Sequence, residues 1–460
     1  MRSTTRVSAL LAVLALVIAA CGGTGGTTTT TGGTTTTGGG VTTTTTGDGT
    51  TTSGATGEPI VFASSLPLTG EFSIAGVKHQ RGYEFCVNEI NDRGGILGRP
   101  VELTIEDNRS DSEVTVQQTE RFINVDNVDI ILGTFSSLLT FPASAVAEQN
   151  GYVYPVPSGG AYRIWARGFQ NIFYFQQRPA EFTGGSIVSL IDHYEGQGII
   201  DARPTTAAIV YADDFFAAAI ANGFVGGTVT IPDTGEEVDL APGFLADAGI
   251  ELVFEEQWPV GFTDWTTLAN SIRNSGAEFL SISTASPDEA ISLIRALQTV
   301  GFQPRMVYAS QGAQSEFQEA LGDAAEGVLI HSVWAPTTNF EGSLAGEPYD
   351  NATFIERYTA ANGAAPDEDE ALPFAVCQGM EQAIIGTGGT DNAAISEWMH
   401  SRTAEEPVRT VVGEFVWDER GLPAARDFLI NQWQGGELAF VFPVGEFPGT
   451  VDMIYPKPEW

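Results

Sequence analysis

The chain of 460 residues has few basic residues, few cysteines and few histidines. It carries 21 Lys and Arg against 58 Asp and Glu, which gives a formal net charge of −37 at pH 7. Because contacts to phosphates depend on Lys and Arg, this balance argues against nucleic-acid binding. The histidines, His79, His193, His331 and His400, are too scattered along the chain to indicate a metal site.

Motifs of the common enzyme classes are also missing. The chain has no G-x-S-x-G elbow, no H-E-x-x-H zinc motif and no P-loop G-x-x-x-x-G-K-[ST]. The stretch GTGGTDN (386–392) lacks the last glycine of a dinucleotide fingerprint and is typical of a turn that ends a helix. The acidic run PDEDEALP (366–373) has carboxylates that could coordinate calcium, but it is more typical of a solvated loop. We therefore expect a protein that is not an enzyme and has neither metal nor cofactor.

The N-terminus has the plan of an export signal. Arg2 and Arg6 precede an apolar run, Ala9 to Ile18, that is too short to span a bilayer. The sequence Ile18-Ala19-Ala20-Cys21 resembles a bacterial lipobox. This resemblance implies that residues 1–21 are a lipoprotein signal peptide with its lipobox cysteine, and that Cys21 receives a diacylglycerol. The alternative is an ordinary secretory signal followed by an accidental cysteine.

Residues 22–57 have almost no apolar surface to bury, because 19 of them are Thr and 13 are Gly. Such a segment cannot offset the entropy of ordering, and we expect a disordered tether. A tether of this kind predicts an exported protein that is lipid-anchored to the outer face of the cell membrane. No other run in the chain is long and apolar enough for a transmembrane helix.

Two cysteines follow the anchor, and export permits a disulfide without requiring one. Cys86 lies on the apolar face of an expected helix, and Cys377 lies in another, 374–385. Two buried free thiols are the simpler interpretation. A disulfide between Cys86 and Cys377 is the alternative.

From Glu58 onward, strand-like and helix-like segments alternate, which predicts an α/β fold with parallel sheets. Because a folded chain of about 400 residues is too large for a single hydrophobic core, we expect two lobes. Between Gly226 and Gly243 we expect a surface hairpin or loop. The expected strands are 60–63, 101–107, 128–133, 151–157, 205–212, 250–256, 279–283, 305–310 and 327–332, and the clearest helices are 76–91, 112–125, 137–150 and 287–300.

Several separated motifs resemble one family. They are LPLTGEFSIAG (66–76), INDRGGILGRPVELTIEDNRSD (90–111), ILGTFSSLLTFPAS (131–144), GDAAEGVLI (322–330), VVGEFVWDERG (411–421) and NQWQGG (431–436). In this order they are similar to the branched-chain amino acid (Leu/Ile/Val) binding proteins of ABC importers, which are periplasmic binding proteins of type I.

The resemblance implies two doubly wound parallel-sheet lobes joined by a three-segment hinge. Lobe 1 would comprise 58–176 plus 334–419, and lobe 2 would comprise 177–333 plus 420–460. The hinge crossings fall near 174–178, 332–336 and 417–422.

The resemblance also implies a function, the extracytoplasmic solute-binding component of an ABC importer. A monomer would capture a small amino-acid-like or carboxylate or amide solute between the lobes. It would deliver the solute to a membrane permease that works with a cytoplasmic ATPase. A ligand-sensing receptor module that signals through a partner protein is the alternative.

Carried over residue by residue, the family's ligand contacts begin at Ser137, whose hydroxyl and amide would hold a carboxylate. The physics agrees, because Ser137 follows a strand and opens a helix, where unpaired amides favour an anion. The competing interpretation is that Ser136 or Ser137 only caps the helix. The loop PSGGAY (157–162) contributes Ser158, Gly160, Ala161 and Tyr162 as a group, unless it is a plain tight turn.

The second lobe departs from the family pattern. Phe216 stands where a tyrosine faces the ligand, and Gln311 replaces the glutamate that pairs with an α-ammonium. Ala285 stands where an aromatic wall is common. In the first lobe, Ala75 stands where the family has an aromatic side chain, and Phe72 could take the place of that side chain. These changes favour a small carboxylate or amide without a free ammonium. Alternatively, Asp213, Asp214 or another acidic side chain takes over the ammonium.

Overall fold

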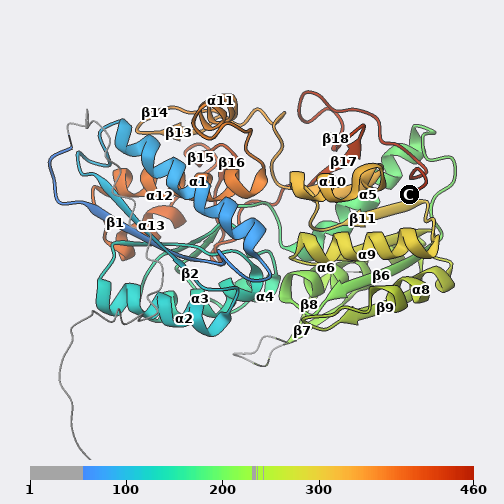
Figure 1. The fold of residues 1–460 in the computed structure, drawn as a ribbon. Coiled ribbons are helices and arrows are strands. Elements are labelled where there is room, and N and C mark those ends of the chain that lie inside the picture. The colour runs from blue at the N-terminus through green and yellow to red at the C-terminus, as the bar shows by residue number, and fades with distance from the viewer. Residues whose placement is uncertain (1–54, 231–234, 236, 242) are drawn as a thin grey trace, which may run out of the picture. The chain divides into compact units, whose positions relative to one another are not determined.

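The computed structural model describes residues 55–230, 235, 237–241 and 243–460 (Figure 1). The predicted signal peptide with Cys21, and residues 22–54 of the predicted tether, lie outside the described residues. Within the described part of the chain, none of the helices has both the length and the apolar character that a membrane span needs.

The first sheet is built from short buried strands. Strand β1 pairs in parallel with β2 on one side and with β3 on the other. The sheet is continued past β3, because the amide of Gly133 donates to the carbonyl of Pro155 at 3.0 Å and β4 pairs in parallel with β5. The spatial order is therefore β2-β1-β3-β4-β5. The chain places β2 on one side of β1 and places β3, β4 and β5 on the other side. The bounds are β1 (Ile60–Leu66), β2 (Val101–Asp107), β3 (Ile130–Leu132), β4 (Tyr154–Val156) and β5 (Ile172–Tyr174).

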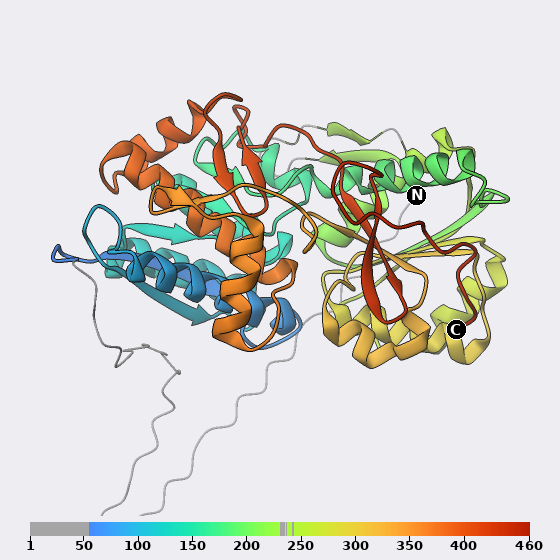
Figure 2. The same cartoon turned by 90° about the horizontal axis from the view of Figure 1, so that it is seen from above.

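The second sheet repeats this order and then adds two antiparallel strands. Its order is β9-β6-β10-β11-β12-β17-β18, and the first five strands are parallel. Although β17 and β18 come from the end of the chain, both views show them (red) beside the elements of 206–332 (Figures 1 and 2). The bounds are β6 (Thr206–Ala212), β9 (Glu251–Trp258), β10 (Phe279–Ser283), β11 (Met306–Ala309), β12 (Val328–Ser332), β17 (Leu429–Gln434) and β18 (Glu437–Phe442).

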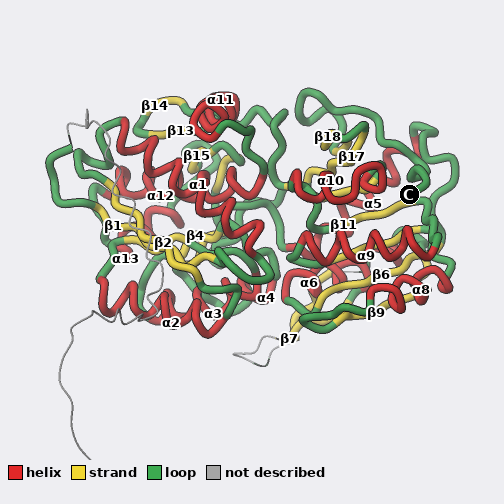
Figure 3. The backbone as a smooth tube through the Cα atoms, viewed as in Figure 1, coloured by secondary structure: helices red, strands yellow, loops and turns green. Residues whose placement is uncertain are grey.

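Helices connect the strands, and Figure 3 shows the strands (yellow) running between them (red). Helix α9 illustrates why they form: Pro287 is its first residue, Gly301 ends it at a φ of 69°, and Ala290, Leu293, Ile294 and Leu297 are buried along one face. The other bounds are α1 (Ser73–Asp92), α2 (Ser112–Arg121), α3 (Ser137–Gln149), α4 (Tyr162–Trp165), α5 (Thr183–Gly196), α6 (Phe215–Val225), α7 (Phe244–Asp247), α8 (Trp265–Ser275), α9 (Pro287–Val300) and α10 (Ser315–Leu321).

Residues 343–415 add a layer beside the first sheet. In this layer α12 packs on α1 so closely that a side chain added at Gly82 would lie 2.3 Å from the carbonyl oxygen of Glu370. The bounds are β13 (Ser343–Leu344), β14 (Glu347–Pro348), α11 (Asn351–Asn362), α12 (Glu368–Thr387), α13 (Asn392–His400), β15 (Val408–Thr410) and β16 (Gly413–Phe415).

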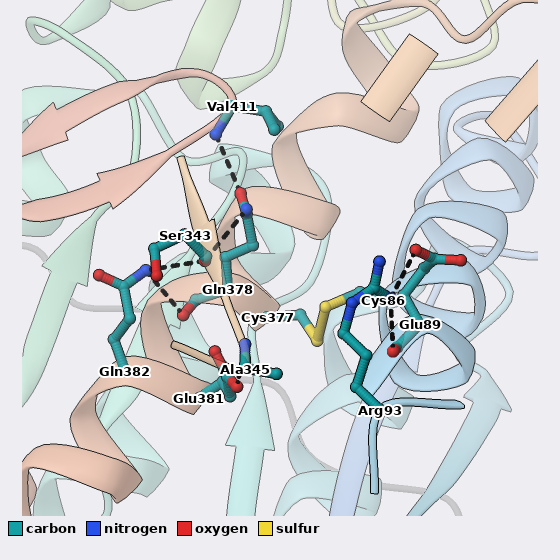
Figure 4. Close-up of a disulfide and its surroundings, with 10 residues drawn as sticks. All are labelled: Cys86, Glu89, Arg93, Ser343, Ala345, Cys377, Gln378, Glu381, Gln382 and Val411. Atoms are coloured by element: carbon teal, nitrogen blue, oxygen red, sulfur yellow. Dashed lines mark hydrogen bonds and ion pairs between the residues drawn. A yellow bond between two sulfur atoms is a disulfide. The ribbon is translucent and has the colours of Figure 1, made fainter. Parts of the chain in front are cut away.

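A disulfide joins α1 to α12. Cys86 and Cys377 are fully buried, their Cα atoms are 6.3 Å apart, and 291 residues separate them in sequence (Figure 4). Of the two interpretations that the sequence left open, free thiols and a bridge, the structure contains the bridge. Neighbouring polar groups are also paired: Arg93 donates to Glu89 at 2.8 Å, and Glu381 accepts from the amide of Ala345 at 2.6 Å (Figure 4).

The hairpin or loop expected between Gly226 and Gly243 is a hairpin of β7 (Gly227–Thr230) and β8 (Glu237–Ala241), with 231–234, 236 and 242 outside the described residues. Two other expected elements differ from the structure. The helix expected over 112–125 is α-helical only to Arg121, and 122–126 form a turn of π-helix. The second difference affects the candidate site.

The acidic run 366–373 is not a solvated loop. Asp367 caps α12 through a reciprocal pair of hydrogen bonds with Glu370, and the helix begins at Glu368. We expected a helix only over 374–385. Pro373 instead lies inside the helix, and Asp369 and Glu370 are buried.

Candidate functional site

A small cavity lies where the carboxyl ends of strands from both sheets meet. Loops after β3 and β4 line one side, the ends of β11 and β12 line another, and the first turns of α12 close it. In open α/β sheets this edge is where ligands bind. The cavity, called the first cavity below, measures about 40 Å³ and is lined by Phe135, Ser136, Ser137, Ser158, Gly159, Gly160, Gln176, Phe216, Ala285, Gln311, His331, Glu368, Asp369 and Leu372.

Most of the predicted ligand contacts are brought together here. The predicted residues that line the first cavity are Ser137, Ser158, Gly160, Phe216, Ala285 and Gln311.

Three predicted contacts do not line it. The amide of Ala161 donates to the hydroxyl oxygen of Ser137 at 3.1 Å, so Ala161 orients a wall residue instead. The ring of Tyr162 lies under the guanidinium of Arg420, which also donates to its hydroxyl, so the side chain is held elsewhere. Phe72 packs against Phe135 with ring centres 5.9 Å apart, outside the cavity.

The serine end of the first cavity offers hydrogen-bond donors. Ser137 begins α3, and because its hydroxyl oxygen accepts from Ala161, its hydroxyl hydrogen is available to a ligand. The buried hydroxyl of Ser136 has no partner. Ser136 stands at the N-cap position, but no side-chain bond caps α3, so the capping interpretation does not describe either serine. First-turn amides and two hydroxyl hydrogens available for donation favour an anionic ligand group.

Ser158 has the opposite role. Nδ1 of the buried His79 lies 3.0 Å from the carbonyl oxygen of Ala75, which can only accept, so Nδ1 carries the hydrogen. Burial lowers the pKa of His79 to about 4, so the ring is neutral and Nε2 accepts. The hydroxyl of Ser158, 2.9 Å from Nε2, therefore donates to it and leaves its lone pairs to the cavity.

The far end of the first cavity holds two carboxyl groups of α12. Glu368 accepts from the amides of Val333 and Trp334 at 2.6 and 3.3 Å, and Asp369 accepts from the side-chain amide of Gln314 at 2.8 Å. Among the described residues, no Lys or Arg forms an ion pair with either group. Burial raises the pKa of each carboxyl group to about 7. Two buried acids without a counter-ion favour a ligand group that brings hydrogen-bond donors or positive charge.

The alternative acids named from the sequence lie elsewhere. Asp213 and Asp214 line a separate cavity of about 10 Å³ together with Phe72. The carboxylate of Asp214 caps α6 by accepting from the amide of Ala217 at 2.8 Å.

Sequence reasoning missed several walls of the first cavity. His331 is the second-last residue of strand β12, and the rule that ligands bind at strand ends could have identified it. Burial lowers its pKa to about 4, and its Nδ1 lies 2.6 Å from the hydroxyl of Tyr308. Glu368 and Asp369 gave no such signal, because they were assigned to a loop. The residues missed are Phe135, Ser136, Gly159, Gln176, His331, Glu368, Asp369 and Leu372.

Known proteins match this chain over most of its length. The chain is 24% identical over 393 residues to Leu/Ile/Val-binding protein homolog 7 of Brucella suis biovar 1 (strain 1330), a match that covers 84% of this chain and 91% of the relative. Its fold is similar to the leucine-binding protein LivK of Thermotoga maritima MSB8, with a TM-score of 0.67, 20% identity, and coverage of 83% of this chain and 97% of that chain. It is also similar to LivJ of Streptococcus pneumoniae in complex with isoleucine, with a TM-score of 0.67, 18% identity, and coverage of 87% and 100%.

A model of the periplasmic binding protein family matches residues 59–227 and 236–437. These ranges include both sheets up to the start of β18 and every wall of the first cavity. The doubled 2-1-3-4-5 strand order and the two similar folds agree with the type I arrangement that the sequence motifs predicted. The chain belongs to the periplasmic binding protein family.

Proposed function

We propose that this protein is the extracytoplasmic solute-binding component of an ABC importer and that it captures a small amino-acid-like, carboxylate or amide solute in the first cavity. Members of its family are solute-binding proteins that work outside the cytoplasm with ABC permeases. The observation that carries the proposal is a cavity with two chemically opposite ends at the carboxyl edges of both sheets. The sensing alternative is not favoured by the relatives, which are named as Leu/Ile/Val-binding proteins.

At the serine end, Ser136 and Ser137 would bind the carboxylate or carbonyl oxygen of the solute. Both hydroxyl groups are buried and have a hydrogen to donate, and the first turn of α3 adds amides and a positive dipole end. Gly160 is closely packed, because an added Cβ would lie 3.0 Å from the hydroxyl of Tyr174, and a larger residue there would have to displace that side chain.

At the acid end, Asp369 and Glu368 would bind the amino or amide nitrogen. The hypothesis of a solute without an ammonium rested on Gln311, which cannot supply a charge. The side chain of Gln314 donates to Gln311 at 2.9 Å and to Asp369 at 2.8 Å, so residue 311 is linked to a carboxylate that α12 brings into the same cavity. We therefore place the compensating acid on α12, and Ser158 adds an acceptor beside it.

Apolar walls between the two ends would hold the rest of the solute. Phe216 lines the cavity from the first turn of α6, Ala285 from the loop after β10, and Leu372 from α12. These side chains favour a compact aliphatic or aromatic group.

The proposed movement follows from the order of elements. We propose lobe 1 as 58–176 plus 334–419 and lobe 2 as 177–333 plus 420–460, closing about the three crossings. The interlobe hydrogen bond between Asp369 and Gln314 would then form on closure, as would the ion pair between Lys78 and Glu316 at 2.8 Å.

We also propose that the protein is exported as a monomer with residues 1–21 as its signal peptide, lipidated at Cys21 and held by the tether 22–57. The composition of residues 1–57 supports this, and it would keep the solute-binding domain beside its permease.

The test is ligand-dependent stabilisation of the chain without residues 1–21. L-leucine, L-isoleucine, 4-methylpentanoate and 4-methylpentanamide are added, and the unfolding midpoint is followed; saturation at 100 times Kd adds about 2.7 kcal/mol to the free energy of unfolding. Ser137→Ala should weaken binding of the stabilising solute by roughly 5- to 150-fold, the effect of losing about 1–3 kcal/mol. The matched control is Ser112→Ala, at the first residue of α2, which should leave binding unchanged. No stabilisation by any compound, or an unchanged Kd in Ser137→Ala, would reject the proposal.

A further inference from the structure

A second and larger cavity lies on the other side of Glu368. It measures about 420 Å³, against about 40 Å³ for the first cavity, and Glu368 is the one wall residue that the two have in common. Its walls come from β17 and β18, α10, the segment 332–336, the residues before and at the start of α12, and the second turn of α1. A volume of this size is typical of small-molecule sites.

Two wall residues of the second cavity have unpaired polar groups, the hydroxyl of Tyr358 and the side-chain amide of Asn431. Asn431, on β17, is 1% exposed, and neither its amide nitrogen nor its amide oxygen has a hydrogen-bond partner. In contrast, the side-chain amide of the next residue, Gln432, is fully paired. Its nitrogen donates to the carbonyls of Gly327 and Ile454, and its oxygen accepts from the amide of Ile454 at 2.7 Å. Buried amides are normally paired in this way, so the side chain of Asn431 requires an explanation.

The basic side chains around the second cavity do not favour an anionic ligand. Lys78 is neutralised by Glu316 at 2.8 Å and by Asp367, and Arg81 lies 3.3 Å from Glu370. The positive charges in the wall are therefore already paired.

Large rings give the second cavity apolar walls. Trp334, Trp433 and Tyr358 all line it, and each is at most 5% exposed. The indole N–H groups of both tryptophans are already used, because Trp334 donates to Asn351 at 2.7 Å and Trp433 donates to the carbonyl of Gly312 at 2.8 Å. The unpaired amide of Asn431 shares the cavity wall with these rings, and this combination favours a planar ligand with one donor and one acceptor side by side.

We propose that the second cavity is a small-molecule site for a neutral carboxamide whose N–H and C=O groups pair with the side-chain amide of Asn431. A carboxamide supplies the donor and the acceptor in the spacing that another carboxamide presents. This site does not depend on the solute that the first cavity binds.

The probe is benzamide, and its Kd is measured on the chain without residues 1–21 by titration calorimetry. Wild-type protein should bind benzamide saturably, and N,N-dimethylbenzamide, which has no N–H to donate, should bind at least tenfold more weakly. This comparison uses the wild-type chain alone, so it does not depend on how a variant folds.

Two variants locate the binding. Asn431→Leu should weaken benzamide binding at least tenfold while its unfolding midpoint stays at or above that of the wild type, because the replaced amide makes no hydrogen bond. Ser112→Ala, at the first residue of α2 and in the wall of neither cavity, should bind benzamide as the wild type does. The proposal is overturned if benzamide does not bind saturably, if its methylated analogue binds equally well, if Asn431→Leu has no effect, or if Ser112→Ala loses binding as strongly as Asn431→Leu.

Discussion

The disulfide gives the stability prediction with the largest expected effect. Cys86 and Cys377 close a loop of 291 residues, for which the chain-entropy relation gives about 5.7 kcal/mol at 25 °C. Both cysteines are fully buried between α1 and α12, where alanine can replace them without leaving a polar group unpaired. We therefore expect Cys86→Ala plus Cys377→Ala to lower the free energy of unfolding by about 5 kcal/mol, measured by urea unfolding with linear extrapolation.

The single variants test the reason for this loss. If the cross-link stabilises the protein by restricting the unfolded chain, removing either cysteine removes the whole effect. Cys86→Ala and Cys377→Ala should each lose nearly as much as the double variant, far from the sum of independent effects. A double-variant loss below about 1 kcal/mol, or losses that simply add, would refute the reasoning.

Two further predictions concern α12. Gly82→Ala places a carbon 2.3 Å from the carbonyl oxygen of Glu370 and 2.6 Å from the ring of Pro373, so this substitution should lower the unfolding midpoint in a thermal melt. The matched control is Gly196→Ala, because a carbon added at Gly196 meets nothing within 4 Å. This control should leave the unfolding midpoint unchanged or raise it. An equal effect of the two substitutions would contradict the close packing of α1 on α12. Burial raises the pKa of Asp369 from 3.8 to about 7, so the folded protein binds more protons there than the unfolded chain, and this group lowers stability as the pH rises from about 4 to about 7. Asp369→Asn should therefore be more stable than the wild type at pH 8 but not at pH 4, measured by urea unfolding of the solute-free protein. A stability difference between the two proteins that does not change with pH would show that the carboxyl group titrates normally.

Regular elements could be predicted from the sequence because their patterns are local. The alternation in VELTIED and the apolar run FLSIS gave β2 and β10 with the bounds that the structure has, and the spacing of apolar residues from Pro287 to Val300 gave α9. The short elements of 343–415 had no comparable signal, because strands of two or three residues carry no periodicity.

The candidate site could be predicted as far as it follows the strand ends. Ser137, Ser158 and Gln311 follow strands, and parallel topology brings such positions to one edge. Asp369 could not be found in this way, because it reaches the first cavity from the start of a helix and the run 366–373 was assigned to a loop, although Asp367 and Glu370 have the spacing of a capping box. The disulfide was undecidable because the 6.3 Å between its Cα atoms is a tertiary distance.

The central claim is that the first cavity holds a solute between a serine end and an acid end. The most direct test is the ratio of the Kd values of 4-methylpentanoate and L-leucine, which differ only by the amino group, in the wild type and in Asp369→Asn. The account predicts that L-leucine binds at least tenfold more tightly to the wild type and that Asp369→Asn reduces this ratio. Equal affinity of the two compounds for the wild type, or a ratio unchanged in Asp369→Asn, would contradict it.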